Sequence, residues 1–209
     1  MKKFITVIPL QVQGQLRRYH YQAVDNSRLQ MDGPTSFPIL AAVNGYVQPG
    51  EEFRLLAIAA DSEDGRRNCA VLRDELERLC RTKGCPCPQI ETIPAPADEG
   101  VAAQIAAFQR LIACVEDDDE LFVCVTYGTK LLSQVTLMAV QYAYQAKKNT
   151  SISCVVYGQI DRSGGQEPER WTARIYDETA LLQLGEIVRV LVQRGTADPR
   201  AAVDEILSL

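Results

Sequence analysis

Two short segments carry the side chains best suited to hold a small ligand. The first follows an apolar run near the start of the chain and contributes Gln11, Gln13 and Gly14. The second, residues 126–130, follows another apolar run and leads into a helical pattern. Open parallel sheets bind ligands outside the carboxyl ends of their strands, where the strand order switches. If both apolar runs are strands, these segments predict a ligand site.

The second segment has residue types that suit a phosphate-bearing ligand. Gly128 lets the backbone approach a ligand closely, and Thr129 can cap the following helix. The free N–H groups at the start of that helix attract phosphate, and Lys130 adds a positive charge. Tyr127 can stack on a base or hydrogen-bond to a ribose. A capped strand-to-helix turn with a surface lysine is the simpler interpretation, and spacing alone favours it because such turns recur across α/β folds.

Several common enzyme classes lack their motifs in this chain. No Gly-x-Gly-x-x-Gly follows the first apolar run, and no Walker-type phosphate loop is present. These absences argue against a conventional dinucleotide oxidoreductase and a P-loop enzyme. His20 is the single histidine, and it is more simply a strand residue than a catalyst. The acidic run over residues 116–120 is expected to be a solvated loop rather than a metal site.

The cysteine pattern favours reduced thiols. Seven cysteines are present, and most lie in apolar segments, where cysteine acts as a small hydrophobe. The odd count argues against a complete disulfide framework. Cys80, Cys85 and Cys87 form one cluster, but a zinc site would need a second pair of ligands. We therefore expect neither a metal nor a cofactor.

Composition and charge are those of an ordinary globular chain. The 209 residues are 46% apolar and suit one domain over residues 1–209. The formal net charge of −5, with both signs interspersed, disfavours binding to duplex nucleic acid. Residues 1–10 lack the features of a signal peptide, and no apolar run is long enough to span a bilayer. The sequence predicts a cytoplasmic protein without membrane contact.

Apolar runs and helical patterns alternate along the chain. We expect strands at residues 4–9, 53–60, 89–93, 121–126, 151–157 and 170–176. We expect helices at residues 37–47, 65–83, 101–115, 129–147 and 177–193, with a last helix starting at Asp198-Pro199. Such alternation predicts a Rossmann-like, doubly wound α/β fold with a mostly parallel sheet and helices on both faces.

Local signals refine these expectations. Gly84 suits a left-handed helix end, while Asp98 and Asp177 are placed to cap the helices that follow them. Residues 19–31 are expected to form a short hairpin or an ordered loop. The helix at 101–115 is expected to bury one apolar stripe, made of Val101, Ile105, Phe108, Ile112 and Val115.

Several motifs follow one another in a recognisable order. A tyrosine-rich Tyr19-His20-Tyr21 and a helix start at residues 35–38 (Thr-Ser-Phe-Pro) come after the first strand. The central strand and loop at residues 124–133 then lead to Tyr142-Ala143 and to a strand ending in Tyr157-Gly158. In this order the chain resembles the CRISPR-associated Rossmann fold (CARF) family, in particular the sensor domain of CARF–HEPN ribonucleases. Departures are Cys124 for aspartate, Tyr127 for histidine and Ser133 for proline in the family motif.

The resemblance implies a stand-alone sensor of type III CRISPR antiviral defence. It implies a homodimer that binds a cyclic oligoadenylate second messenger across its axis. The ligand-binding residues that the resemblance implies are Gln11, Gln13, Gly14, Thr126, Tyr127, Gly128, Thr129 and Lys130; of these, Thr126, Gly128 and Lys130 keep the character of the family motif. The HEPN ribonuclease motif Arg-x4–6-His is absent, because no arginine stands at that spacing before His20, the single histidine.

Two alternatives stay open. One is a metal-independent ring nuclease, in which Lys130 stabilises charge that develops at the reacting phosphate. The other is a degenerate relative that binds another nucleotide.

Overall fold

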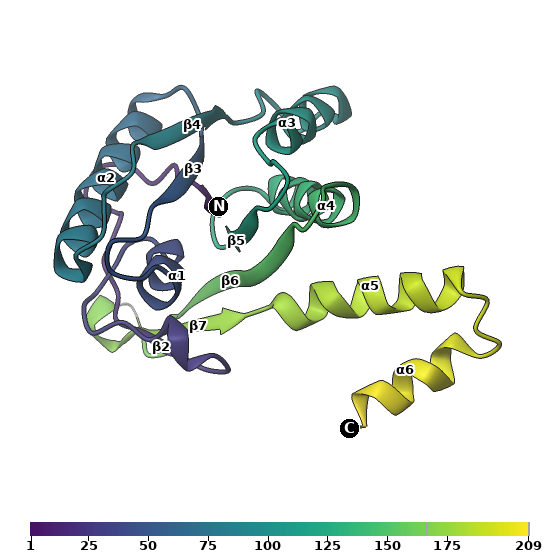
Figure 1. Cartoon of the computed structure of the whole chain (residues 1–209). Coiled ribbons are helices and arrows are strands. Elements are labelled where there is room, and N and C mark those ends of the chain that lie inside the picture. The colour runs from purple at the N-terminus through teal and green to yellow at the C-terminus, as the bar shows by residue number, and fades with distance from the viewer. Residues whose placement is uncertain (166, 209) are drawn as a thin grey trace. The chain divides into compact units, whose positions relative to one another are not determined.

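The expected apolar runs form the strands of one sheet (Figure 1). A computed structural model describes residues 1–165 and 167–208 of the chain. The chain divides into two compact units, Met1–Asp177 and Glu178–Leu209. The single domain expected over residues 1–209 stays a prediction.

The centre of the sheet is parallel. Its strands are β1 (Lys2–Val7), β3 (Phe53–Ala59), β4 (Ile90–Pro94), β5 (Glu120–Cys124) and β6 (Ser151–Asp161). β7 (Thr172–Asp177) pairs antiparallel with β6, and the short β2 (Tyr21–Ala23) pairs parallel with β7. The order across the sheet is β2-β7-β6-β5-β1-β3-β4. The predicted doubly wound α/β class is confirmed.

The strand order switches between β1 and β5. After β1 the chain forms the edge strand β2 and α1, then returns to β3 and β4 on one side of β1, and finally to β5 and β6 on the other side. Connections at such a switch point leave in opposite directions and open a crevice at the carboxyl ends of the strands. Thr6 pairs with Cys124, so β1 and β5 end nearly level. The two segments singled out in the sequence therefore border one crevice.

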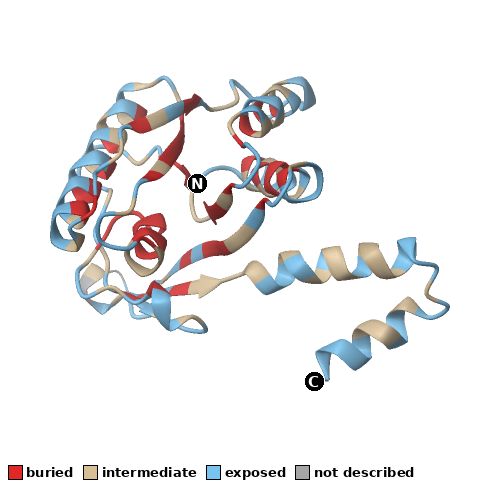
Figure 2. Cartoon of the chain, in the orientation of Figure 1, coloured by how far each residue is buried: buried red, intermediate tan, exposed pale blue. Residues whose placement is uncertain are grey.

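Helices cover both faces of the sheet. α1 (Ile39–Tyr46) and α2 (Glu63–Lys83) contact each other and strands β1, β3, β5 and β6. α3 (Val101–Ala113) and α4 (Lys130–Ala146) contact each other and strands β4 and β6 on the opposite face (Figure 1). Buried residues line the strands and the inner helix faces (Figure 2). At the centre, the ring of Phe4 stacks on that of Phe122, with centroids 4.5 Å apart.

A buried ion pair joins the start of β1 to the loop before β5. Lys3 has no exposed surface, and its Nζ lies 2.7 Å from a carboxylate oxygen of Asp119, itself only 2% exposed. The same ammonium donates to the Cys114 carbonyl and to Glu116, both at 2.9 Å. The expected solvated loop holds for residues 116–118, which are exposed, but not for Asp119, which is buried because a buried lysine needs an acidic partner.

The expected inner stripe of α3 was only partly right. Val115 is buried and Phe108 and Ile112 are half-buried, but Val101 is 75% exposed and Ile105 54% exposed. The buried residues of the helix itself are Gln104, Ala107 and Leu111. The periodicity indicated a helix correctly but did not indicate which face the sheet and α4 would cover.

The capping expectations had mixed outcomes. Gly84 ends α2 in the left-handed conformation (φ 70°), as predicted. Asp98 does not cap α3, because Gly100 occupies that position and Asp98 accepts from its N–H at 2.7 Å. Asp177 ends β7 and accepts from the Asn26 amide, while Glu178 is the N-cap of the next helix. Residues 19–31 form an ordered loop with β2 and a short 3-10 helix at Ser27–Leu29.

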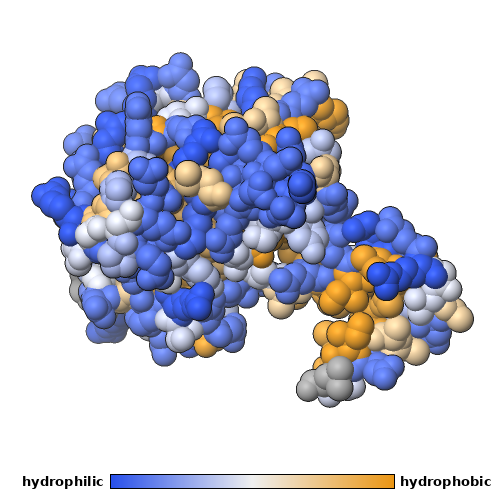
Figure 3. Space-filling model, in the orientation of Figure 1, coloured by the Kyte–Doolittle hydropathy of each residue, from blue (hydrophilic) through white to orange (hydrophobic). Residues whose placement is uncertain are grey.

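The second unit consists of α5 (Thr179–Gln193) and α6 (Pro199–Leu207), which contact each other. Gly195 follows α5 in the left-handed conformation, and α6 starts at Asp198-Pro199 as predicted, with Asp198 as its cap. No described residue of either helix is buried, and Figure 3 shows apolar surface on both. None of the described helices is long and apolar enough to cross a membrane.

Replacing Lys3 by methionine should destabilise the protein strongly. The change keeps the side-chain volume but removes the buried counter-ion of Asp119 and leaves only the partly exposed N-terminal ammonium, 3.6 Å away, a loss of about 3–5 kcal/mol in the free energy of unfolding. The measurement is the urea midpoint followed by far-UV circular dichroism. Arg66→Ala is the control, because its ion pair with Asp61 is exposed and contributes about 0–1 kcal/mol. Similar midpoints for the two variants would contradict the role of Lys3.

Candidate functional site

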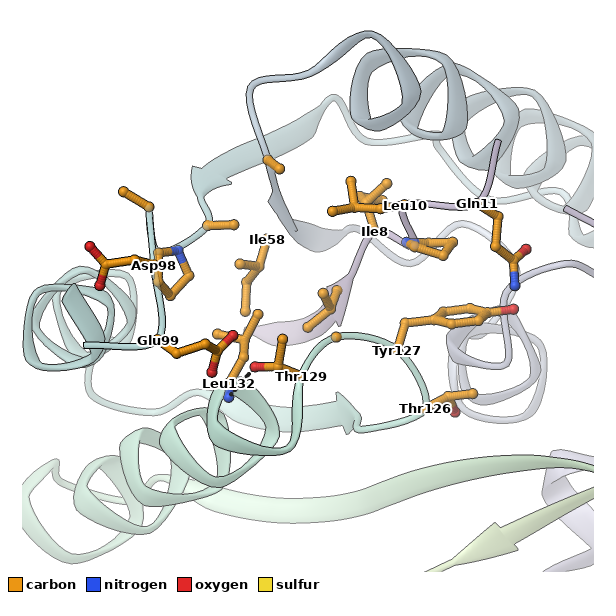
Figure 4. A pocket seen from close by; sticks show the side chains of 17 residues that line it. Ile8, Leu10, Gln11, Ile58, Asp98, Glu99, Thr126, Tyr127, Thr129 and Leu132 are labelled. Carbon is orange, nitrogen blue, oxygen red and sulfur yellow. Dashed lines mark hydrogen bonds between the residues drawn. The ribbon is translucent and has the colours of Figure 1, made fainter. Parts of the chain in front are cut away.

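A cavity of about 460 Å³ lies at the carboxyl ends of β1, β3, β4 and β5 (Figure 4). We call it the first recess. Its apolar wall comes from Ile8, Leu10, Ile58 and Leu132. Its other lining residues include Gln11, residues 95–99 after β4, and residues 126–129 after β5. The crevice rule applied to the sequence therefore located a real cavity.

Gly128 is required by the backbone between β5 and α4. Its φ of 98° lies in a region that residues with a side chain rarely adopt. An added Cβ would also lie 3.1 Å from Cγ1 of Val7, a closer contact than packed side chains normally make. At Gly128 the loop after β5 therefore lies close to strand β1. This contact holds the bottom of the first recess against the core.

The threonines of this loop position the backbone. Thr129 is the N-cap of α4, and its Oγ1 accepts from the Leu132 N–H at 3.2 Å, as predicted. Thr126 Oγ1 accepts from the Gly158 N–H at 2.8 Å and thereby ties the end of β5 to β6. Thr126 also lines the cavity, so one hydroxyl can both hold the sheet and face a ligand.

Tyr127 is a fixed wall rather than a free hydrogen-bonding group. Its hydroxyl donates to the Ser36 carbonyl at 2.6 Å, and its ring meets that of Phe37 edge to face. Burial raises the pKa of this hydroxyl above its ordinary value, and the neighbouring Tyr21 adds to the effect. Because the hydroxyl is already engaged, the ring is the part of Tyr127 that a ligand can contact.

A second recess of about 470 Å³ adjoins the first across Tyr127. The two share Gln11, Thr126 and Tyr127. Further residues of the second recess come from the segment after β1 and from the β6–β7 hairpin; they are Gln15, Arg17, Tyr19, Tyr21, Gly158, Ile160, Arg162 and Trp171. This recess is rich in aromatic rings and carries two arginines.

Side chains of α2 hold the segment after β1 in place. Asn68, which is buried, donates to the carbonyls of Pro9 (2.7 Å) and Gln11 (2.9 Å), and Arg67 donates to the Gln11 carbonyl at 3.0 Å. The side-chain oxygen of Gln11 is buried and has no hydrogen-bond partner among the described residues. That oxygen can accept a hydrogen bond from a ligand.

Charge is divided unevenly between the recesses. The first is bordered by Asp98 and Glu99, and Figure 4 shows the Glu99 carboxylate pointing toward Thr129 at the amino end of α4. That helix end attracts anions, so a carboxylate already faces the position expected for a phosphate. The arginines lie in the second recess instead.

The structure brings together only some of the residues singled out in the sequence. Gln11, Thr126 and Tyr127 line both recesses, and Gly128 and Thr129 line the first. The remaining residues, Gln13, Gly14 and Lys130, are exposed and line neither.

No motif in the sequence pointed to the second recess. Arg162 directly precedes the turn at residues 163–165 and Trp171 begins the return toward β7, but no local pattern places either beside Tyr127. Residues 95–99 follow a predicted strand, so the crevice rule could have found them.

Neither the known protein-family models nor the curated protein sequences give a match to this chain.

Replacing Gly128 by alanine should destabilise the first unit by about 1–3 kcal/mol, because an alanine is strained at this positive φ and meets Val7. The measurement is the urea midpoint followed by fluorescence of Trp171. The control is Gly33→Ala, which enters open space without a positive φ and should change stability by no more than about 0.5 kcal/mol. If Gly128→Ala unfolds at the same urea concentration as its control, the loop at Gly128 does not approach Val7 as closely as the structure indicates.

Proposed function

We propose that this chain binds a cyclic oligoadenylate in the crevice between β1 and β5, as a dimeric sensor in type III CRISPR antiviral defence. Resemblance to the CARF family suggests the ligand. The observation that carries the proposal is the pair of adjoining recesses, which meet at Gln11, Thr126 and Tyr127. One is largely apolar and the other aromatic and cationic. A nucleotide needs both environments, because its base has apolar faces and its phosphate is charged.

The first recess suits a purine base. Ile8, Ile58 and Leu132 offer apolar surface on which the faces of a base can pack. Gln11 supplies a buried amide oxygen that no described residue uses, and an exocyclic amine can donate to it. A base that enters the recess relieves this unsatisfied group, which makes hydrogen bonding there more favourable than at an exposed amide.

Ring cleavage receives less support from the site than binding. Cleavage without a metal requires a group that stabilises charge at the reacting phosphate. Lys130 was the residue predicted for that role, and it lines neither recess of the single chain. The ring-nuclease alternative therefore stays a prediction without a geometric observation in its favour.

An exposed apolar patch fits the proposed dimer. Val101 and Ile105 of α3, with Leu131, Met138 and Tyr142 of α4, form what we call the α3–α4 patch. Phe108 meets Tyr142 edge to face at 5.9 Å and joins the two helices there. Apolar surface over α3 is visible in Figure 3. Contiguous apolar surface of this kind marks interaction sites.

The α3–α4 patch lies beside the first recess. Leu131 is in the first turn of α4 and directly precedes Leu132, which lines the recess. A two-fold contact at the patch buries the same residues on both copies and brings their recesses close to one axis. A cyclic ligand that bridges two copies requires that arrangement.

Cyclic tetra- or hexa-adenylate should stabilise the purified chain without metal. Ligand that binds only the folded state adds about 2.7 kcal/mol at a concentration of about 100 times the Kd. The measurement is the melting temperature, with chromatography of the nucleotide in the same samples. Linear tetra-adenylate and cyclic di-adenylate serve as controls for ring size and charge.

A raised melting temperature with an intact ring supports the sensor. Linear products in place of intact ring support the ring nuclease instead. An unchanged melting temperature with every cyclic oligoadenylate overturns the proposal.

Replacing Met138 by lysine should convert the proposed dimer into monomer. The side chain is 49% exposed in the single chain, so the variant folds, but a dimer would bury the new charge. Light scattering after size exclusion gives the mass. Val24→Lys is the control, because Val24 is 48% exposed and lies beside β2, outside the patch. A dimer that survives Met138→Lys unchanged would remove the α3–α4 patch as its interface.

A further inference from the structure

We propose that the second recess is a phosphate subsite, in which Arg17 and Arg162 hold a phosphate or phosphodiester group of a nucleotide beside Trp171. The inference rests on the proposed function in taking a nucleotide as the ligand, but the two fail on different measurements. It assigns anion binding to Arg17 and Arg162 beside the β6–β7 hairpin, instead of to Lys130 at the start of α4.

Two guanidinium groups converge on one indole ring. Arg162 lies 4.8 Å from the centroid of Trp171, and Arg17 lies 5.9 Å from it. The two arginines come from distant parts of the sequence, one after β1 and the other after β6. The Trp171 N–H donates to the Gly165 carbonyl at 2.8 Å, which fixes the ring in the hairpin. Tertiary structure alone gathers these groups.

The recess offers these cations no counter-ion. Among the described residues, no aspartate or glutamate lines it, and neither Arg17 nor Arg162 forms an ion pair. The adjacent carboxylate of Asp161 accepts instead from the Ser163 N–H at 2.8 Å. Contact with an aromatic ring stabilises each guanidinium group, but it does not neutralise the charge. An anion that enters the recess supplies the missing counter-charge.

The chemistry of the lining favours phosphate over other anions. Guanidinium groups donate paired hydrogen bonds to phosphate oxygens. Gln11 and Gln15 supply amide groups next to the arginines, and Tyr19 and Tyr21 supply rings. These groups suit the sugar and base that accompany a phosphate, whereas a bare inorganic anion would use only the arginines.

The first recess sets the orientation of the ligand. Glu99 points toward the amino end of α4 and opposes a phosphate there (Figure 4). Across Tyr127, the arginines attract one. A nucleotide that spans both recesses therefore places its base in the first and its phosphate in the second.

The intrinsic fluorescence of the full-length chain tests this directly, because Trp171 is the only tryptophan in the sequence. AMP and cyclic tetra-adenylate are titrated separately, with sodium sulfate at matched ionic strength as the anion control. We expect both nucleotides to change the Trp171 emission at concentrations where sulfate does not. Added salt should weaken the response, because a charge attraction at a partly exposed site is screened.

Arg17→Gln and Arg162→Gln should each weaken nucleotide binding by about tenfold or more, since a hydrogen bond to a charged group contributes about 1.5–3 kcal/mol. Arg174→Gln is the matched control, because Arg174 is an exposed arginine of β7 that lies outside the recess. Arg162→Lys keeps the charge without the paired donors and should fall between wild type and Arg162→Gln. Circular dichroism confirms that each variant is folded.

The outcomes separate the two proposals. If cyclic tetra-adenylate raises the melting temperature while Trp171 emission and both glutamine variants are unaffected, the phosphate subsite is wrong and the sensor stands. If AMP changes the emission through both arginines while no cyclic oligoadenylate binds, the subsite stands and the sensor is wrong. Equal responses to AMP and sulfate would also overturn the nucleotide subsite.

Discussion

The pairing of β1 with β5 is the constraint on which the rest of the first unit depends. At its amino end Lys3 is buried, and an unpaired buried charge would cost several kcal/mol, so Asp119 must lie beside it. That ion pair favours one register, in which Lys3 lies opposite Leu121 and Thr6 opposite Cys124. The strands therefore end level, and the loops after both open into the same crevice. A shifted register would separate Lys3 from Asp119 and move the two loops apart.

Tyr127 separates the acidic part of that crevice from its cationic part. Tyr127 is held by its hydrogen bond to Ser36 and by Phe37, so it divides the crevice into two recesses without moving. The acidic side faces the amino end of α4, and the cationic side faces the β6–β7 hairpin. Charges interact more strongly in such partly desolvated recesses than in bulk water. Because of this separation, the two ends of the crevice differ in charge, whereas a symmetric charge distribution would make them alike.

Apolar surface outside the core is the second general feature of the structure. α3 buries Gln104, Ala107 and Leu111 and exposes Val101 and Ile105. Full burial of a large apolar side chain contributes about 1.5–3 kcal/mol, so leaving two of them in water forgoes stability that a partner surface can recover. The helices of the second unit show the same property, since none of their described residues is buried.

Local sequence patterns were enough to specify the elements and the edge of the sheet that carries the candidate site. Alternating apolar runs and helical patterns, with signals such as Gly84 and Thr129, specify local structure because each acts within a few residues. The crevice rule then located the two loops. Only the tertiary structure decided that Lys130 lies outside both recesses and that Arg17 meets Arg162 at Trp171. Those outcomes depend on where the β6–β7 hairpin lies and on which face of each helix is covered, and no local pattern encodes contacts between segments so far apart.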